Sequence, residues 1–501
     1  MELIRNFPSF SILLCMFGGI ISSALRGKAA KRINTALILV VMMMQVAVLY
    51  YTVKTGTFYV YQMGRFSAPW GNELRAGVLE GFMALFFSII MFLSMVGGSL
   101  ERTLDIEEEK QNLYYVLINL LMSSLLALVY TNDLFTAYVF VEINTISACG
   151  LIMIRQNGRT IEAAVRYMVM SLLGSGLLLL GICFLYSLTG HLLMSNIKTE
   201  VVALAASGEY QAPLMLTIGL MCIGLAIKSA LFPFHTWLPD AYGYSTVSSS
   251  AILSSLVSKG YIFLLLKLFY RVFGLSVIAD SHVTNILFAF GIAGMIIGSI
   301  AAIRESEVRR MIAYSSVAQI GYIYMGFGMG TTFGIVASVY HIVCHAATKS
   351  LLFIAASGLT ESSNNKKDFF SLTGAGYRNR VAGVAFSAGA LSMVGLPMFA
   401  GFISKILFAE AAVGTPGKMF WAFFALAIST ILNAVYFMKT VIRIYTPARY
   451  YIDDSGMQTI TVKMQAAKAF SMICLIVVNL MLGLNSDPII RLIETGIDMF
   501  S

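Results

Sequence analysis

The sequence predicts an all-α membrane protein with about fourteen transmembrane helices. Of its 501 residues, 58% are hydrophobic and only 12% are charged, which is about half the charged share of a soluble domain. The hydrophobic residues form runs of about 20 or more, the length that a helix needs to cross the hydrocarbon core of a bilayer. This composition excludes a cytosolic enzyme, a nucleic-acid-binding protein and a disordered chain, because each of these needs more surface charge.

The candidate spans follow one another without room for a soluble domain, and the longest connections between them are 54–77 and 189–212. The span 380–414 is too long for one straight helix and contains Gly395-Leu396-Pro397, so we expect a broken helix there. The predicted spans are 4–25, 34–53, 78–100, 113–130, 134–155, 161–188, 213–235, 246–270, 284–303, 311–329, 332–358, 380–414, 419–445 and 464–484.

The distribution of basic residues predicts the orientation of the chain. Arg26, Lys28, Lys31 and Arg32 follow the first apolar run, whereas a signal peptide carries its charge before that run, so we expect a retained first helix. The odd-numbered connections and their flanks carry nineteen Lys and Arg, which predicts that they are cytoplasmic and that both termini lie outside. The even-numbered connections carry seven, namely Lys54, Arg65, Arg75, Lys198, Lys267, Arg271 and Lys418. The net charge of +9 fits this one-sided arrangement better than it fits nucleic-acid binding.

No motif in the sequence indicates a cofactor. The six cysteines lie far apart in apolar runs without a CxxC pair, so we expect packing residues rather than zinc, iron–sulfur or disulfide sites. No dinucleotide fingerprint, P-loop or nucleophile elbow occurs. We therefore expect no covalent chemistry. The cysteines are Cys15, Cys149, Cys183, Cys222, Cys344 and Cys474.

Ionisable residues in the middle of a span are costly, and each is therefore a candidate functional residue. Glu142 lies eight residues into its span, about 12 Å deep, and must be paired or protonated there. A static ion pair that holds helices in register is the alternative. Lys228 precedes Pro233, which removes a backbone hydrogen bond and predicts a broken helix, a recurring way to build ion sites. Snorkelling of Lys228 towards the surface is the alternative here.

Lys405 and Pro397 repeat this combination in the reverse order. Five spans separate the two broken helices, and an odd offset places two related units in opposite membrane orientations, as in an inverted repeat. Lys259 lies between the two halves on a span that is rich in serine. The serine hydroxyls could hold water around a mobile proton, or they could allow close helix packing.

His341, His345 and Lys349 recur every four residues and therefore line one helical face. Two histidines at this spacing could bind zinc, but a lysine one turn further would repel the ion and no third ligand is evident, so we expect no metal. A proton relay suits imidazole better, since imidazole gains and loses a proton near neutral pH. Hydrogen bonding within a helical bundle remains the alternative.

Four segments together resemble the antiporter-like subunits of respiratory complex I, of Mrp-type cation/proton antiporters and of membrane-bound hydrogenases. The segments are AIKSALFPFHTWLPDAY with Lys228, the serine-rich helix with Lys259, HxxxHxxxK at 341–349, and GLPMFAGFISK with Lys405. The resemblance covers nearly the whole chain. The stretch FSAPWG before the third span, the sixth span and the surroundings of Lys405 are most similar to the D subunit of Mrp-type antiporters.

The resemblance implies two inverted five-helix repeats, spans 4–8 and 9–13, within a division into 1–112, 113–271, 284–445 and 446–501. It implies that Glu142 pairs with Lys228, that Lys259 is a central lysine and that Lys405 is the terminal base. Protons would pass from Lys228 through Lys259 and the histidine and hydroxyl groups to Lys405.

The implied function is proton translocation in an Mrp-type Na+/H+ antiporter of a prokaryotic cell membrane. Its partners would be other membrane subunits, and protons and Na+ would be the transported ions. A homologous proton-pumping subunit of a membrane-bound hydrogenase or of complex I is the alternative, although lysine rather than glutamate at position 405 disfavours the complex I branch. The residues alone also leave open an intramembrane metalloenzyme and a scaffold whose buried charges hold helices together.

Overall fold

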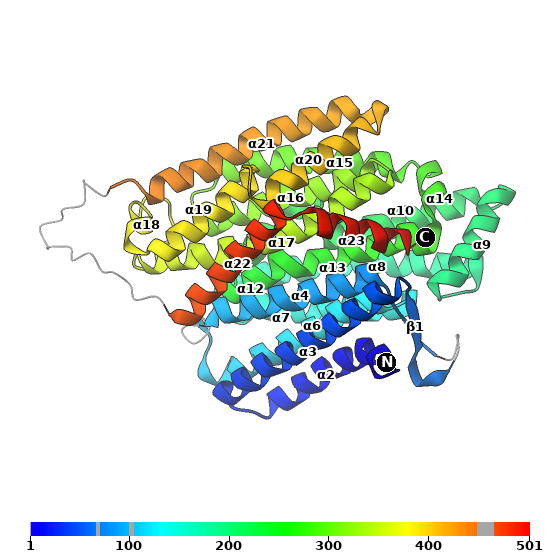
Figure 1. The fold of residues 1–501 in the computed structure, drawn as a ribbon, viewed down its shortest axis with the longest axis horizontal. Coiled ribbons are helices and arrows are strands. Elements are labelled where there is room, and N and C mark those ends of the chain that lie inside the picture. The colour runs from blue at the N-terminus through cyan, green and yellow to red at the C-terminus, as the bar shows by residue number, and fades with distance from the viewer. Residues whose placement is uncertain (1, 67–70, 100–104, 448–464, 501) are drawn as a thin grey trace, which may run out of the picture.

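Long helices that run side by side make up most of the structure, a computed structural model that describes residues 2–66, 71–99, 105–447 and 465–500 (Figure 1). In this part of the chain, eleven helices are long and apolar enough to cross a membrane, and Phe7–Ser23 and Arg380–Val394 are shorter apolar helices. The prediction of a helical, multi-pass membrane protein is therefore confirmed. The residues 67–70 of the FSAPWG stretch, Arg102, Arg449 and Lys463 lie outside the described residues.

The N-terminal part contains three long helices and a small hairpin that the sequence did not predict. The hairpin occupies the connection 54–77, where two strands pair antiparallel with Tyr59 opposite Ala76. The elements are α1 (Glu2–Arg5), α2 (Phe7–Ser23), α3 (Gly27–Thr55), β1 (Tyr59–Gln62), η1 (Met63–Arg65), β2 (Glu73–Ala76) and α4 (Val78–Gly97).

The middle part carries the first interrupted helix. The connection 189–212 contains a helix, α9, which packs against the segment 268–273 rather than forming a plain loop. The elements are η2 (Glu108–Lys110), α6 (Gln111–Tyr130), α7 (Leu134–Met153), α8 (Gly158–Thr189), α9 (Met194–Ser207), α10 (Gln211–Lys228), η3 (Phe234–Trp237), α11 (Leu238–Tyr244), α12 (Val247–Ile252), η4 (Leu253–Val257), α13 (Ser258–Lys267) and η5 (Leu268–Phe273).

The C-terminal part carries the second interrupted helix. Its elements are α14 (Leu275–Asp280), α15 (Val283–Arg304), α16 (Val308–Gly328), α17 (Thr332–Glu361), α18 (Ala375–Arg378), α19 (Arg380–Val394), α20 (Ala400–Val413), α21 (Pro416–Ile444), α22 (Ala466–Leu484) and α23 (Asp487–Asp498). In Figure 1, α2 and α3 lie at one edge of the bundle and α21 lies at the opposite edge. The hairpin, α9 and both labelled chain ends lie towards the same end of the bundle.

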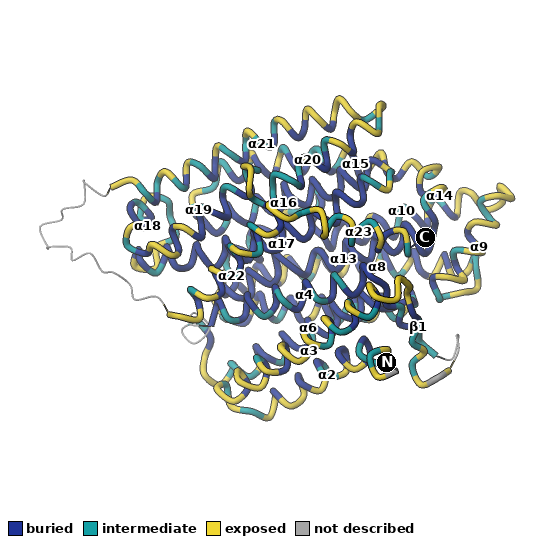
Figure 2. Tube along the Cα trace, viewed as in Figure 1, coloured by how far each residue is buried: buried dark blue, intermediate teal, exposed yellow. Residues whose placement is uncertain are grey.

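Burial follows this layout, because the central helices are dark and the outer ones are largely exposed (Figure 2). The helix Thr332–Glu361 and the continuous helical stretch Val247–Phe273 are buried throughout their most apolar windows. Large apolar side chains such as Phe17, Met43 and Phe420 are exposed on the outer helices. Exposed apolar surface of this extent is what a helix bundle presents to lipid.

Both predicted helix interruptions are present. The helix α10 ends at Lys228, five residues before Pro233, and the chain resumes as the short helices η3 and α11. The helix α19 ends at Val394, where Gly395 adopts a left-handed conformation with φ +88° and its N–H bonds back to the Leu391 carbonyl. Pro233 in the first interruption and the left-handed Gly395 in the second each prevent another helical turn from forming, so both interruptions have local causes.

Candidate functional site

The expected ion pair between Glu142 and Lys228 is present. The Lys228 Nζ lies 3.6 Å from the Glu142 carboxylate, with the lysine side chain fully buried and the glutamate side chain 25% exposed. Lys228 also donates a 2.8 Å hydrogen bond to Thr145 Oγ1, and Ser175 of α8 donates one to Glu142. Lys228 therefore turns inward rather than snorkelling. Glu142 itself stays partly accessible, since only half of the apolar window of α7 is buried.

A polar cluster surrounds this pair and joins α7, α10 and α13. The ring of Tyr261 lies 5.4 Å from Lys228 Nζ, close enough for a cation–π contact. The Tyr261 hydroxyl donates to Asn144 Oδ1 at 3.0 Å and lies 3.3 Å from Thr145 Oγ1. The lysine is thus stabilised by one carboxylate, one hydroxyl and one aromatic face.

Lys259 is fully buried and contacts only neutral groups among the described residues. Its Nζ donates to the Ser254 carbonyl and to Ser258 Oγ at 3.2 Å. The π-helical turn η4 directly precedes it, and such turns often occur at functional sites. Several serines of this span bond to neighbouring backbone or side chains, as Ser250 does with the Tyr242 carbonyl, whereas Ser255 Oγ has no partner in the described chain. The bonded serines support a role in helix packing, and the unpartnered hydroxyl of Ser255 supports a role in holding water.

The two histidines of α17 stack on each other at a ring distance of 6.0 Å. His341 Nδ1 lies 2.6 Å from Ser404 Oγ of α20, and its ring also stacks on Tyr322 of α16 at 5.4 Å. Within the described residues, His341 Nε2 and both ring nitrogens of His345 are buried without a hydrogen-bond partner. Buried polar atoms of this kind are normally satisfied by water. In the same part of the chain, no group of three or more His, Cys, Asp or Glu side chains is placed to hold a metal ion.

Lys349 and Lys405 contact carbonyl and hydroxyl oxygens. Lys349 Nζ donates to the Ile312 carbonyl at 2.7 Å and to Ser315 Oγ. Lys405 Nζ donates to the Val394 carbonyl at 2.5 Å, at the end of the interrupted helix α19. Its ammonium also lies 6.0 Å from the Tyr322 ring centre, so Tyr322 stands between Lys405 and His341.

The structure thus gathers the sequence-predicted residues into two groups. Glu142 and Lys228 form the first, and His341, His345 and Lys405 meet around Tyr322 in the second. Lys259 and Lys349 belong to neither group by direct contact: Lys259 bonds to Ser254 and Ser258 of its own helical stretch, and Lys349 bonds to Ile312 and Ser315 of α16. The prolines, Pro233 and Pro397, lie in the two interruptions next to these groups.

Several buried ionic contacts were not predicted. Arg271 pairs with Glu80, with side chains 3% and 1% exposed, and Lys468 lies 2.7 Å from Glu361. Lys267 is buried and donates to the carbonyls of Leu128 and Thr131, each at 2.8 Å. These residues lie near predicted span ends, where sequence patterns do not separate a loop charge from a buried one.

Two residues that were assigned to connections, and the tryptophan of the first interruption, are buried. Lys267, Arg271 and Trp237 are at most 3% exposed. Trp237 packs edge-on against Tyr167 at 4.9 Å and donates to the Ile227 carbonyl at 3.4 Å, an oxygen that also accepts from the Ala230 N–H just after α10. Trp237 is therefore a packing residue of the first interruption.

These features define a class of protein: a multi-pass membrane protein with ionisable side chains buried beside two interrupted helices. Residues 131–432 match the family described as NADH:quinone oxidoreductase/Mrp antiporter, transmembrane, and the chain belongs to this family. The matched range includes both interruptions and the seven ionisable residues predicted from the sequence, namely Glu142, Lys228, Lys259, His341, His345, Lys349 and Lys405.

Two relatives show the breadth of this family. The chain is 33% identical over 400 residues to NADH-quinone oxidoreductase subunit N of Desulforudis audaxviator, covering 79% of this chain and 77% of the relative. It is 27% identical over 355 residues to the D subunit of the Na(+)/H(+) antiporter of Alkalihalophilus pseudofirmus, covering 70% and 69%.

Two solved structures share the fold over the full chain. The archaeal membrane-bound sulfane sulfur reductase contains a chain that superposes with a TM-score of 0.87 at 24% identity, covering 100% of this chain and 98% of that one. The Mrp complex from Dietzia sp. DQ12-45-1b contains one with a TM-score of 0.85 at 24% identity and the same coverage.

Proposed function

We propose that the chain is the proton-translocating membrane subunit of an Mrp-type Na+/H+ antiporter. The observation that carries this proposal is the Glu142–Lys228 ion pair at the end of α10. A buried lysine held charged by one movable carboxylate can bind or release a proton when that carboxylate moves. The similarity to the D subunit of a Na(+)/H(+) antiporter and the fold shared with the Mrp complex support the same function.

The finer architecture belongs to the proposal. The eleven candidate spans, α2, α16 and the interrupted pair α19–α20 together make fourteen. In the inverted repeats, α6 to η5 form the first unit and α15 to α21 form the second, each with its fourth span interrupted. Residues 1–112 form the N-terminal helices and 446–501 the C-terminal part. The connections after α15, α17 and α21 are cytoplasmic, and both termini lie outside.

In the mechanism, charge moves between the two polar groups without covalent chemistry. A proton leaves Lys228 when Glu142 separates from it, passes Lys259 and the His345–Lys349 region, and reaches Lys405 through His341 and Tyr322. One elementary charge across the membrane corresponds to about 2.3 kcal/mol per 100 mV. The rearrangement of a few buried ion pairs therefore suffices to couple this movement to an ion gradient.

A subunit of a redox-driven respiratory complex is the second candidate. The 33% identity to NADH-quinone oxidoreductase subunit N and the fold shared with an archaeal respiratory membrane complex favour it. Both candidates require partner membrane subunits and use the same polar residues. They differ in the energy source, which is a cation gradient in the first and a redox module in the second.

The test uses the complete complex, purified with its partner subunits and reconstituted into liposomes. An imposed Na+ gradient should drive proton flux in the wild type, and Lys228→Ala should abolish it while the complex still assembles. Lys54→Ala, which removes an exposed lysine of α3, is the matched control and should retain flux. Retained flux in Lys228→Ala would favour a scaffold role. Flux only after addition of a redox substrate would favour the second candidate.

A further inference from the structure

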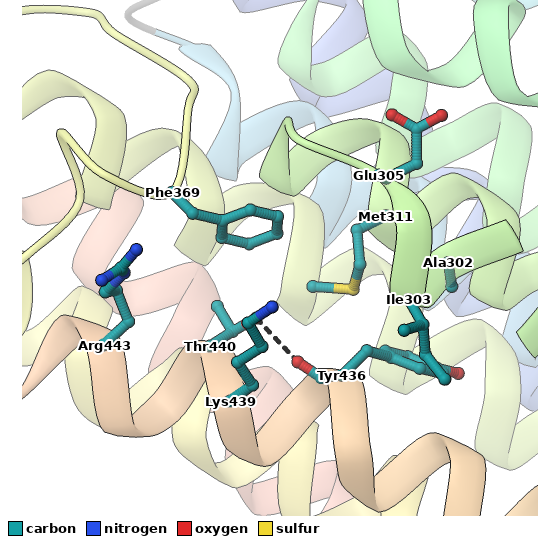
Figure 3. A pocket seen from close by; sticks show the side chains of 9 residues that line it. All are labelled: Ala302, Ile303, Glu305, Met311, Phe369, Tyr436, Lys439, Thr440 and Arg443. Carbon is teal, nitrogen blue, oxygen red and sulfur yellow. Dashed lines mark hydrogen bonds between the residues drawn. The ribbon is translucent and has the colours of Figure 1, made fainter. Parts of the chain in front are cut away.

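A small cavity lies where the ends of α15 and α21 meet the start of α16. In Figure 3, α21 supplies Tyr436, Lys439 and Thr440 on one side, and Phe369 and Met311 close the opposite side. About 20 Å³ of it is open to the centres of water molecules, which is enough for one water. Lys439 is exposed, so the cavity borders the surface at the end of the bundle that carries the connection between α15 and α16.

A buried polar face of α21 leads inward from this cavity. Thr440, Tyr436, Asn433 and Ser429 recur at intervals of three or four residues, and all are at most 3% exposed. They therefore share one helical face that is about 16 Å long. The rest of the buried face of this helix is formed by apolar residues and alanines. A membrane helix that packs against other helices does not need a row of polar side chains for close packing, because small apolar residues allow equally close packing.

This face is incompletely hydrogen-bonded within the described chain. Tyr436 donates to Asn433 Oδ1 at 2.5 Å, and Ser299 of α15 lies 3.4 Å from the same oxygen. Asn433 Nδ2, Ser429 Oγ and the Tyr322 hydroxyl, however, are buried without a partner in the described part. Ordered water best explains the unpartnered Nδ2 of Asn433, because this group would otherwise carry its full desolvation cost, whereas the hydroxyls of Ser429 and Tyr322 lie close to each other.

The inner end of the face reaches the second polar group at two points. Tyr436 lies beside Ser315, whose hydroxyl bonds to Lys349. Ser429 lies beside the hydroxyl of Tyr322, whose ring stacks on His341. A line of water along α21 would therefore connect the surface cavity with both Lys349 and His341, independently of the Glu142–Lys228 pair.

We propose that this face of α21 is a hydrated access path that carries protons between the cavity at Lys439 and the His341–Lys349 region. The inference rests on the proposed function. It gives the His341–Lys349 region its own connection to the membrane surface, on the side that is assigned above to the cytoplasm and separate from the Glu142–Lys228 pair. Asn433 is the residue of choice for testing the path, because its side-chain oxygen contacts both Tyr436 and Ser299 and its side-chain nitrogen has no partner in the described part of the chain.

Accessibility of the path is tested first, without any measurement of transport. Ser429→Cys, a near-isosteric change, and Thr440→Cys are placed in the assembled complex in inverted vesicles, and Ag+ in chloride-free medium is added outside. Peptide mass spectrometry after denaturation and maleimide labelling reads each thiol. Both introduced cysteines should be blocked at least tenfold faster than Ala425→Cys, which is buried one turn beyond Ser429, and faster than the buried native Cys222. Equal, slow blocking of all four thiols would overturn the proposal.

Transport then tests whether the path is used. Asn433→Leu fills it with apolar atoms and should lower cation-driven proton flux at least tenfold in assembled complexes, whereas Asn433→Ser keeps a polar, water-binding group and should retain most of the flux. Full flux in Asn433→Leu would overturn the role of the path while the proposed antiport stands. Fast Ag+ blocking of the introduced cysteines, together with no cation-driven proton flux in the wild type, would instead overturn the proposed function. The face of α21 would then be hydrated without a role in antiport.

Discussion

The substitution Glu142→Gln tests the ion pair while keeping the shape of the side chain. At 3.6 Å from Lys228, the carboxylate contributes about 4.6 kcal/mol of Coulomb attraction at an effective dielectric constant of about 20. Because a quarter of the glutamate side chain is exposed, solvent screens part of this attraction, and we take about 2 kcal/mol as the effective loss. That loss corresponds to a proton affinity of Lys228 that is about 30-fold lower.

The expected result is therefore a decrease of about 30-fold in cation-driven proton flux, measured with a pH-sensitive dye in vesicles that hold the assembled complex. Ser175→Ala removes only a hydrogen bond to Glu142 and should cost about tenfold or less, since such a bond to a charged group is worth about 1.5 kcal/mol. Glu410→Gln changes an exposed acid of α20 and should leave the flux unchanged. Wild-type flux in Glu142→Gln, or an equal loss in Glu410→Gln, would refute the reasoning.

Three further results are expected. Lys405→Ala should abolish flux in assembled vesicles, and Lys405→Arg should do the same because guanidinium does not release its proton; full flux in the arginine variant would leave Lys405 a structural charge. Gly395→Ala places a Cβ 2.8 Å from Lys405 Cδ at φ +88°, so it should lower the unfolding temperature in detergent by a few degrees, whereas Gly417→Ala, with open space around it, should not. Burial, with the nearby Arg309 and Arg155 charges, lowers the pKa of Lys367 to about 8. The charged Lys367 therefore destabilises the folded state below pH 8, and this destabilisation disappears as the pH rises from 8 to 10.5, the ordinary pKa of lysine. Lys367→Met should therefore stabilise the complex at pH 7 in thermal unfolding and lose this gain near pH 10.5.

The two interruptions and the need of Glu142 and Lys228 for partners could be predicted from strong local signals, whereas the pairing of these two residues with each other was implied by the family resemblance. Glu142 and Lys228 stand alone in apolar runs, where a charge has few solutions other than a partner. Pro233 and the Gly395-Leu396-Pro397 segment interrupt the backbone whatever packs around them. The fold class follows from the length of the apolar runs.

The features that were not predicted depend on tertiary packing. Glu80 and Arg271 lie within a few residues of span ends, and only the folded bundle shows that they meet in its interior. The helices α9 and α23 are amphipathic or weakly apolar, so hydropathy does not mark them as spans. The polar face of α21 includes Ser429, Asn433 and Tyr436. The sequence shows these residues, but only the folded structure shows that polar atoms on this face lack hydrogen-bond partners.

The reversed order of lysine and proline in the two halves has a structural explanation. Lys228 is the last residue of α10, and Lys405, although it belongs to α20, places its ammonium on the carbonyl of Val394 at the last residue of α19. The C-terminal end of a helix carries a partial negative charge of about half an electron, which favours a cation there. The end of α19 therefore stabilises the Lys405 ammonium, whereas the Lys228 ammonium is held by Glu142 and Thr145 of α7. In the first interruption the lysine belongs to the helix that ends, and in the second it belongs to the helix that follows, so lysine and proline occur in opposite orders.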